Sequence, residues 1–222
     1  MKAIIFKLFL ILSIVNFYSC NNDEFDPIII NSEENPIDSN ESSIDYNLLF
    51  IGNSLTYVND LPNLVRSIAE VNGKIIDVTI IANGNYALID HWNDGIIQTL
   101  IESGNYDFVI VQQGPSSQPY GRELLIEYGV KISELCRDYN TQLAYYMVWP
   151  SLTNYSTFDG VIFSYTKAAN LTNDILCPVG EVWKSHFDET NDFSYYGSDG
   201  FHPSLEGSNV AARIIYESLF SE

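Results

Sequence analysis

From residue 46 onward, the chain alternates nearly continuous apolar runs with segments of helical periodicity. The apolar runs predict five strands, at 47–51, 75–82, 107–111, 142–148 and 178–182. Strands without alternation of polar and apolar residues are typical of a parallel sheet that is covered on both faces. The pattern therefore predicts a buried parallel sheet.

Apolar residues spaced three and four apart between these runs predict the helices. The stripes lie at 61–69, 124–136 and 210–219, with less regular ones at 96–103 and 161–174. Asp60 is the predicted N-cap of the first helix, and Pro62 falls in its first turn. Strands and helices in strict succession imply right-handed crossovers, and so an α/β fold with three α/β/α layers around about five parallel strands. In such sheets ligands bind outside the carboxyl ends of the strands.

The first nineteen residues have the features of a secretory signal peptide. They contain two lysines, an apolar run over 6–15 and the small Ser19 at their end. The run is too short for a permanent membrane span, and no second span follows it. Cys20 stands where a bacterial lipoprotein signal places its acylated cysteine, although Phe17 replaces the commoner leucine. The alternative is a plain signal peptide cleaved near Ser19.

Residues 20–45 are predicted to be a flexible tether. They carry eight carboxylates and no Lys or Arg, and such a segment buries too little apolar surface to order itself. The acids at 23, 24 and 26 resemble the surface-export signals of lipoproteins in the Bacteroidetes, or they are simply a solvated linker. We expect an exported outer-membrane lipoprotein, with cell-surface exposure left open and membrane contact through the lipid anchor only.

Residues 46–222 then form one domain, whose charge restricts its partners. The whole chain has a net charge of −19, and removing the signal's two lysines and the tether's eight acids leaves 21 acidic and 8 basic residues. A surface with this excess of negative charge repels the phosphate backbone of nucleic acids. The charge therefore excludes nucleic acid as a partner. Cys136 and Cys177 either pair or serve as small buried side chains, and their apolar surroundings favour unpaired thiols.

Two segments at opposite ends of this domain carry candidate chemistry. Ser54 follows the first strand in a Gly-Asn-Ser turn, near the N-terminus of the next helix. A Gly-x-Ser turn alone does not identify a nucleophile, because serines at such turns commonly cap the helix. Asp199 and His202 share a loop ahead of the last helix. At this spacing a carboxylate can orient the imidazole, whose other nitrogen then faces a nucleophile.

These residues resemble the sequence blocks of the SGNH, or GDSL, hydrolases. Residues 52–55 (Gly-Asn-Ser-Leu) resemble the family's Gly-Asp-Ser-Leu block, and residues 199–203 (Asp-Gly-Phe-His-Pro) match its closing Asp-x-x-His-Pro block. The resemblance covers nearly all of residues 46–222 and implies a flavodoxin-like SGNH fold. It also implies that Ser54 is the nucleophile, activated by His202 and Asp199, with no metal or other cofactor.

The two inner blocks bear on the oxyanion hole. Residues 83–85 (Asn-Gly-Asn) resemble the block that supplies a glycine N–H, which would be that of Gly84. Residues 107–117 align with the block that ends in Gly-x-Asn-Asp, but Ser116 stands where the donor asparagine is expected. Either the Ser116 hydroxyl donates weakly, or an amide from Gln112 or Gln113 replaces it.

The expected activity is hydrolysis of carboxylic esters by acyl transfer, with acetylated glycans as a substrate class and lipids or small esters left open. Several aromatic residues near the strand ends are candidates for stacking on sugar rings: Tyr57, Trp92, Tyr120, Trp149 and Tyr155. The altered third block supports an alternative, a glycan-binding surface lipoprotein with weak or no turnover. The sequence carries no signal for a particular oligomeric state.

Overall fold

The computed structural model describes residues 43–220. Its centre is a five-stranded sheet in which every pair of neighbouring strands is parallel. The strand order is β2-β1-β3-β4-β5. The strands are β1 (Tyr46–Gly52), β2 (Ile76–Ala82), β3 (Phe108–Val111), β4 (Gln142–Tyr146) and β5 (Ile175–Cys177).

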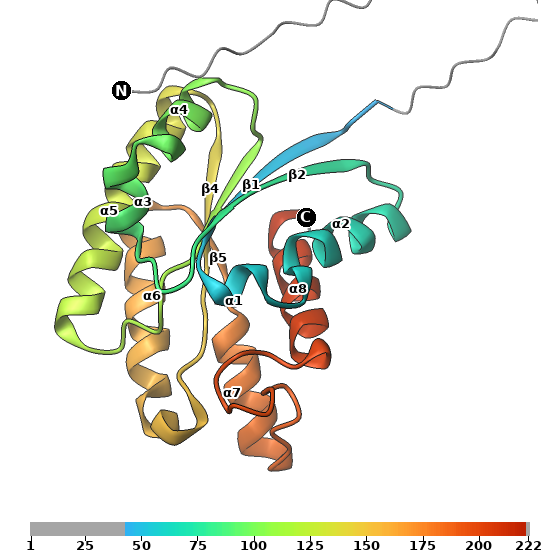
Figure 1. The fold of residues 1–222 in the computed structure, drawn as a ribbon, viewed down its shortest axis with the longest axis vertical. Coiled ribbons are helices and arrows are strands. Elements are labelled where there is room, and N and C mark those ends of the chain that lie inside the picture. Colours follow the sequence, from blue (N-terminus) through green and yellow to red (C-terminus); the bar gives the residue numbers. More distant parts are fainter. Residues whose placement is uncertain (1–42, 221–222) are drawn as a thin grey trace, which may run out of the picture. The chain divides into compact units, whose positions relative to one another are not determined.

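Helices cover the sheet on both faces. They are α1 (Ser54–Tyr57), α2 (Leu61–Val71), α3 (Leu88–Asp94), α4 (Ile96–Glu102), α5 (Pro119–Asp138), α6 (Phe158–Thr172), α7 (Val179–Thr190) and α8 (Leu205–Phe220). Helices α2 and α8 pack together on one face, whereas α3, α5 and α6 pack in sequence on the other (Figure 1). The predicted three-layer α/β/α sandwich is thus confirmed.

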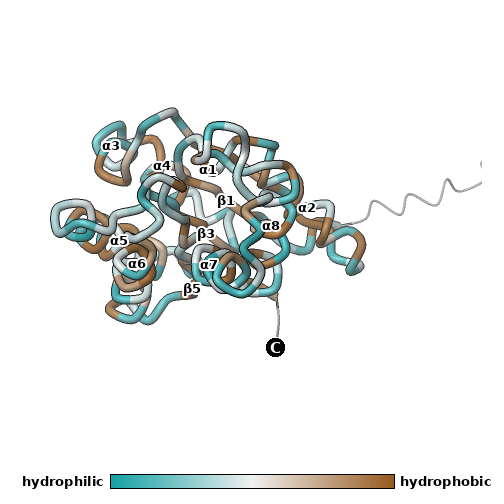
Figure 2. The backbone as a smooth tube through the Cα atoms, turned by 90° about the horizontal axis from the view of Figure 1, so that it is seen from below, coloured by the Kyte–Doolittle hydropathy of each residue, from teal (hydrophilic) through white to brown (hydrophobic). Residues whose placement is uncertain are grey.

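Burial of the inner strand β1 explains the unbroken apolar runs. Leu48, Leu49, Phe50 and Ile51 are consecutive in β1 and all are 0% exposed. Neighbouring side chains of a strand point to opposite faces, so both faces of β1 are covered. Along the helices hydrophobic and hydrophilic positions alternate, as Figure 2 shows for α2 and α8. Their apolar sides complete the core.

The fifth predicted strand is wrong. Residues 179–182 begin helix α7, with Pro178 as the N-cap, and the strand is the three-residue segment just before Pro178. Pro178 has no N–H to donate to the sheet, which ends the strand. Gly180 packs against the segment that follows β4, and a Cβ added to it would be 2.1 Å from the carbonyl oxygen of Val148. This close approach brings the first turn of α7 against the sheet.

The reversal of strand order sets the position of the crevice. The chain moves outward from β1 to β2 and then, in the other direction, through β3, β4 and β5. In open α/β sheets the crevice lies at this switch point, beyond the carboxyl ends of the two central strands. Here these are β1 and β3, so Ser54 and the block after Val111 lie at its edge.

Two further predictions concern the membrane and the cysteines. Within residues 43–220 no helix has both the length and the apolar character needed to cross a bilayer. Cys136 and Cys177 are buried and unpaired, as favoured from the sequence. Burial raises the pKa of both thiols to about 12. The predicted signal peptide, Cys20 and most of the tether lie outside the described residues.

Candidate active site

A tight turn places Ser54 at the start of helix α1. Asn53 caps this helix, because its side-chain oxygen accepts the N–H of Leu55 at 3.1 Å. Gly52 is required at the end of β1, since an added Cβ would be 2.2 Å from the hydroxyl of Thr56. Among the described contacts the N–H of Ser54 itself has no acceptor. The first N–H groups of a helix face a region of positive potential, so this one is a candidate donor to an anion.

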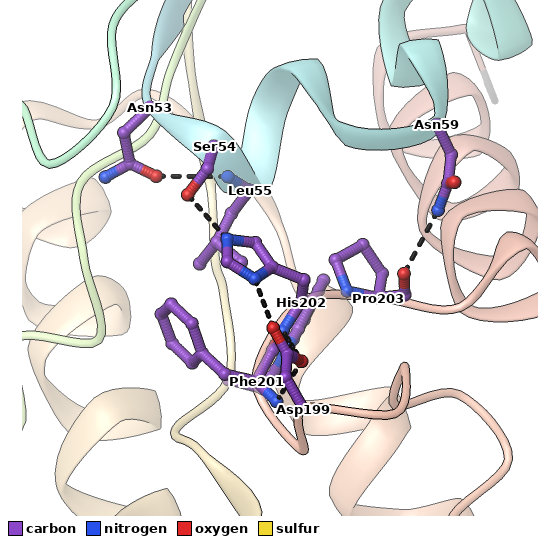
Figure 3. Close-up of polar contacts among 9 residues, drawn as sticks. Asn53, Ser54, Leu55, Asn59, Asp199, Phe201, His202 and Pro203 are labelled. Carbon is purple, nitrogen blue, oxygen red and sulfur yellow. Dashed lines mark hydrogen bonds and ion pairs between the residues drawn. The ribbon is translucent and has the colours of Figure 1, made fainter.

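His202 joins the two ends of the domain. Its Nε2 lies 2.9 Å from Oγ of Ser54, and its Nδ1 lies 2.6 Å from Oδ2 of Asp199 (Figure 3). The ionised carboxylate accepts the proton of Nδ1, which leaves Nε2 free to accept the proton of the serine. The sequence-predicted trio therefore meets in one chain of hydrogen bonds across 148 positions.

The Asp199 carboxylate is held by the loop as well as by the histidine. Its Oδ1 accepts the N–H groups of Phe201 and His202, each at 2.9 Å. The hydrogen bond from His202, together with these backbone donors, holds the pKa of Asp199 below its usual range. The carboxylate is thus ionised and oriented toward the imidazole.

Asn59 anchors the histidine loop to the nucleophile segment. Its amide donates to the carbonyl of Pro203 at 3.1 Å (Figure 3). It also donates to the hydroxyl of Ser208 at 3.0 Å. Its backbone has a φ of 56°, in the left-handed region that asparagine tolerates better than most residues. No sequence motif marks this residue, whose only local signal is its place in a polar Asn-Asp turn ahead of Pro62.

Ser54 lines a hollow of about 360 Å³ together with the segment after β2. The N–H groups of Gly84 and Asn85 have no acceptor among the described contacts. Both residues are exposed, but Asn85 lines the hollow and Gly84 does not. Both N–H groups are therefore candidate donors to an anion in the hollow, and of the two residues only Asn85 lines it.

Gln112 holds the turn that carries the serine. Its side-chain oxygen accepts both the N–H of Asn53 and the hydroxyl of Thr56, each at 2.9 Å. Its amide nitrogen donates to the carbonyl of Gln113 at 2.7 Å. Both residues of this pair are buried, with 1% and 4% exposure. Gln112 is a positioning residue for the Ser54 turn.

Gln113 and Ser116 line the same hollow, but their side-chain N–H and O–H groups already donate to acceptors within the protein. The Gln113 amide donates to Oγ of Ser116 and to the carbonyl of Gly121, both at 2.9 Å. The Ser116 hydroxyl donates to the carbonyl of Gly114 at 2.8 Å. The described structure thus presents neither side chain as a free donor beside the serine, whereas the backbone N–H groups of Ser54, Gly84 and Asn85 are without an acceptor.

His91 is a second supporting residue that no sequence motif marks. It is 1% exposed, and its Nε2 lies 2.8 Å from the carbonyl oxygen of Gly52. Because that oxygen can only accept, Nε2 carries the proton. Burial lowers the pKa of His91, so the ring is held neutral. Its contact fixes the end of β1 two residues before the nucleophile. Its only signal in the sequence is its place after a short apolar stretch.

Within residues 43–220 no group of three or more His, Cys, Asp or Glu side chains is placed to hold a metal ion. Among the lining residues of the hollow, all of them described, none is charged. The titratable groups in the hydrogen-bond chain of Ser54 are His202 and Asp199.

No family model matches the chain, and no curated protein matches it. Solved structures do resemble it. A protein of Slackia heliotrinireducens assigned to the SGNH hydrolases has a TM-score of 0.66 and 23% identity, over 79% of this chain and 99% of its own. A lipase/acylhydrolase from Enterococcus faecalis has a TM-score of 0.64 and 13% identity, over 78% of this chain and 95% of its own.

A variant of an acetyl-xylooligosaccharide esterase from Geobacillus has a TM-score of 0.61 and 17% identity, over 80% of this chain and 95% of its own. Identities this low establish a shared architecture. The described domain, with its parallel sheet ordered β2-β1-β3-β4-β5, has the fold of the SGNH/GDSL hydrolases.

Proposed function

We propose that the protein is a serine hydrolase that cleaves carboxylic esters by acyl transfer. The observation that carries this proposal is the hydrogen-bond chain from Ser54 Oγ through His202 to Asp199, with distances of 2.9 and 2.6 Å. A serine within reach of an imidazole whose other nitrogen meets a carboxylate is the arrangement that activates a hydroxyl as a nucleophile.

The proposed reaction has two halves. Ser54 attacks the acyl carbonyl while His202 takes its proton, and the imidazolium then gives that proton to the leaving alcohol. Water attacks the acyl-serine in the same way and releases the acid. Asp199 remains ionised throughout, keeps the imidazole in the productive tautomer and stabilises its charged form.

Two backbone donors are proposed for the oxyanion. The N–H of Ser54 and that of Asn85 have no acceptor among the described contacts, and both residues line the hollow. This assignment shifts the second donor by one residue from Gly84, the position that the sequence suggested. Ser116 and Gln113 would act indirectly, by shaping the loop beside the hollow. In this proposal the oxyanion hole has two backbone donors and lacks the side-chain amide of the asparagine that Ser116 replaces. The loss of one oxyanion donor costs on the order of 10²–10³ in turnover.

We place acetylated glycans first among substrates. An acetyl-xylooligosaccharide esterase shares the fold, and a neutral hollow suits an uncharged ester. Of the aromatic residues suggested for stacking, Tyr120 lines the hollow and is 73% exposed. Trp149 is wrong for that role, because it is 0% exposed and its Nε1 donates to the carbonyl of Phe201.

The test is hydrolysis of 4-nitrophenyl acetate by wild type and by Ser54→Ala. The variant should lose essentially all turnover while its circular dichroism spectrum stays unchanged. Ser185→Ala is the matched control, because Ser185 is exposed on α7 and hydrogen-bonds only Glu189 there. Turnover in Ser54→Ala equal to that of the control would remove Ser54 from the mechanism.

A second candidate function is glycan binding without efficient turnover. The observation in its favour is the third block, in which both the Gln113 amide and the Ser116 hydroxyl donate internally. A protein that binds acetylated oligosaccharides but hydrolyses none of them, and whose Ser54 resists an active-serine probe, would support this alternative.

We also propose, from the sequence, that the protein is exported and anchored through an acyl chain on Cys20. Labelling of cells with an alkyne analogue of palmitate should mark the wild type and not Cys20→Ala. A soluble, unlabelled wild-type protein would instead support cleavage near Ser19. Protease treatment of intact cells separates an outward-facing domain from one that faces the periplasm.

A further inference from the structure

We infer that a second hollow beside the nucleophile binds the alcohol part of the ester, and that this alcohol is a neutral sugar. This hollow, which we name the alcohol subsite, has a volume of about 490 Å³. It adjoins the hollow of Ser54, because Pro115 and Phe201 line both. The inference rests on the proposed ester hydrolysis and adds to it the residues that select the substrate.

The position of His202 indicates which part of the ester enters the alcohol subsite. After the serine oxygen bonds to the acyl carbon, the bond to the alcohol oxygen breaks and Nε2 of His202 protonates that oxygen. The leaving alcohol must therefore lie on the histidine side of Ser54. Phe201 directly precedes His202, and their ring centroids are 5.2 Å apart (Figure 3). An alcohol that crosses the Phe201 ring reaches the alcohol subsite.

The wall of the alcohol subsite is fixed to the histidine loop. The N–H of Leu152 donates to the carbonyl of Gly200 at 2.8 Å, and the hydroxyl of Tyr196 donates to the carbonyl of Pro150 at 2.8 Å. These contacts tie the segment that carries Ser151 and Asn154 to the loop of His202. A sugar bound to this segment would therefore keep a fixed position relative to Nε2 of His202, which protonates the leaving oxygen.

The lining of the alcohol subsite fits a carbohydrate. Its polar members are hydroxyl and amide side chains, namely Ser117, Gln118, Ser151, Asn154 and Thr157. None of its lining residues, all within the described part of the chain, carries a charge. Hydroxyls and amides both donate and accept, as sugar hydroxyls do, whereas an ionic ligand would call for opposite charge.

Two of these side chains are free to bind a ligand. Among the described hydrogen bonds, the hydroxyl of Ser117 and the amide of Gln118 make none, although both line the alcohol subsite. Gln118 precedes α5 without capping it through its side chain. Both can therefore be replaced by alanine without loss of an internal hydrogen bond. Phe201 and Pro115 add apolar surface for the carbon-bound hydrogens of a sugar ring.

The experiment compares two acetyl esters in the full-length protein, monoacetylated xylobiose and 4-nitrophenyl acetate. Both deliver the same acyl group, but only the first carries a sugar as its leaving alcohol. In Gln118→Ala, kcat/KM for the sugar ester should fall about threefold to tenfold relative to that for the aryl ester, as expected for one lost hydrogen bond. The double variant with Ser117→Ala should lower this ratio further. Gln142→Ala is the matched control, since Gln142 is exposed at the opposite end of the sheet, at the start of β4.

The outcomes separate this inference from the proposed function. A selective fall in the ratio, together with an unchanged ratio in Gln142→Ala, supports the alcohol subsite. If hydrolysis depends on Ser54 but neither subsite variant changes the ratio, the inference is overturned and the esterase stands. If Ser54→Ala hydrolyses both esters as fast as wild type, the proposed function falls, and the inference with it.

Discussion

Replacement of Asp199 by asparagine tests how the histidine is oriented. Oδ1 of Asp199 accepts two backbone N–H groups at 2.9 Å, and an asparagine oxygen can keep both of these bonds. Oδ2, which lies 2.6 Å from Nδ1 of His202, would become an NH₂ group. That group donates to Nδ1 and so favours the tautomer with its proton on Nε2, which cannot accept the proton of Ser54.

The magnitude follows from the distance and the exposure. At 2.6 Å the attraction between carboxylate and imidazolium is about 1.6 kcal/mol in the dielectric of bulk water, or roughly tenfold in rate. Asp199 is 50% exposed and His202 is 36% exposed, so water screens the pair strongly. The value for bulk water is therefore a lower bound on the attraction, because the protein around the pair has a lower dielectric constant. With the wrong tautomer added, we expect kcat to fall about 10²–10³-fold, less than the about 10⁴-fold known for a buried triad aspartate.

The assay is steady-state hydrolysis of 4-nitrophenyl acetate, with urea unfolding in parallel. The free energy of unfolding should change by less than about 1 kcal/mol, because an exposed ion pair contributes little. Asp192→Asn is the matched control, since Asp192 also accepts a backbone N–H at 2.9 Å and lies 3.8 Å from a histidine, His186. If Asp199→Asn kept kcat within threefold of wild type, or if the control lost as much, the assigned role of Asp199 would be refuted.

Three further changes test the supports of the site. Burial lowers the pKa of His91, so the unfolded chain binds its proton more readily, and the free energy of unfolding should fall as the pH drops below about 6.5. His91→Gln, which keeps a donor for Gly52, should show a smaller loss between pH 7.5 and 5.5 in urea titrations, and an equal loss would contradict this. Asn59→Ala breaks two hydrogen bonds around the histidine loop and should lower kcat more than it changes KM, with about 1–3 kcal/mol of destabilisation measured by urea unfolding; an unaltered kcat would argue against a positioning role. Ser116→Asn suits the φ of 56° there and adds an amide donor, so kcat for an aryl acetate should rise about tenfold, and no gain would show that the hole is not short of a donor.

The sequence predicted the parts of the fold that depend on burial. The runs at β1 and β3 are apolar on both faces, because helices cover both sides of the central strands. β5 has only three residues, and the apolar character that continues past Pro178 belongs to a helix, so hydropathy alone placed the strand too late. The one-turn helix α1 is too short to show a helical period.

The site was predictable where it depended on topology and not where it depended on side-chain orientation. Ser54 follows β1, and His202 lies in the loop that precedes α8. The carboxyl edge of a parallel sheet brings such positions together. The roles of Gln112, Asn59 and His91 rest on hydrogen bonds to backbone groups that are 39 to 144 positions away. No local pattern encodes those partners, so the structure was needed to find them.

The central claim is that Ser54 is an activated nucleophile, and the most direct measurement is covalent labelling by a fluorophosphonate with the adduct located by mass spectrometry. The account predicts an adduct on Ser54, a rate of labelling that falls sharply in His202→Ala, and no adduct in Ser54→Ala. An unlabelled wild-type protein, or a label on another serine that persists in Ser54→Ala, would contradict it.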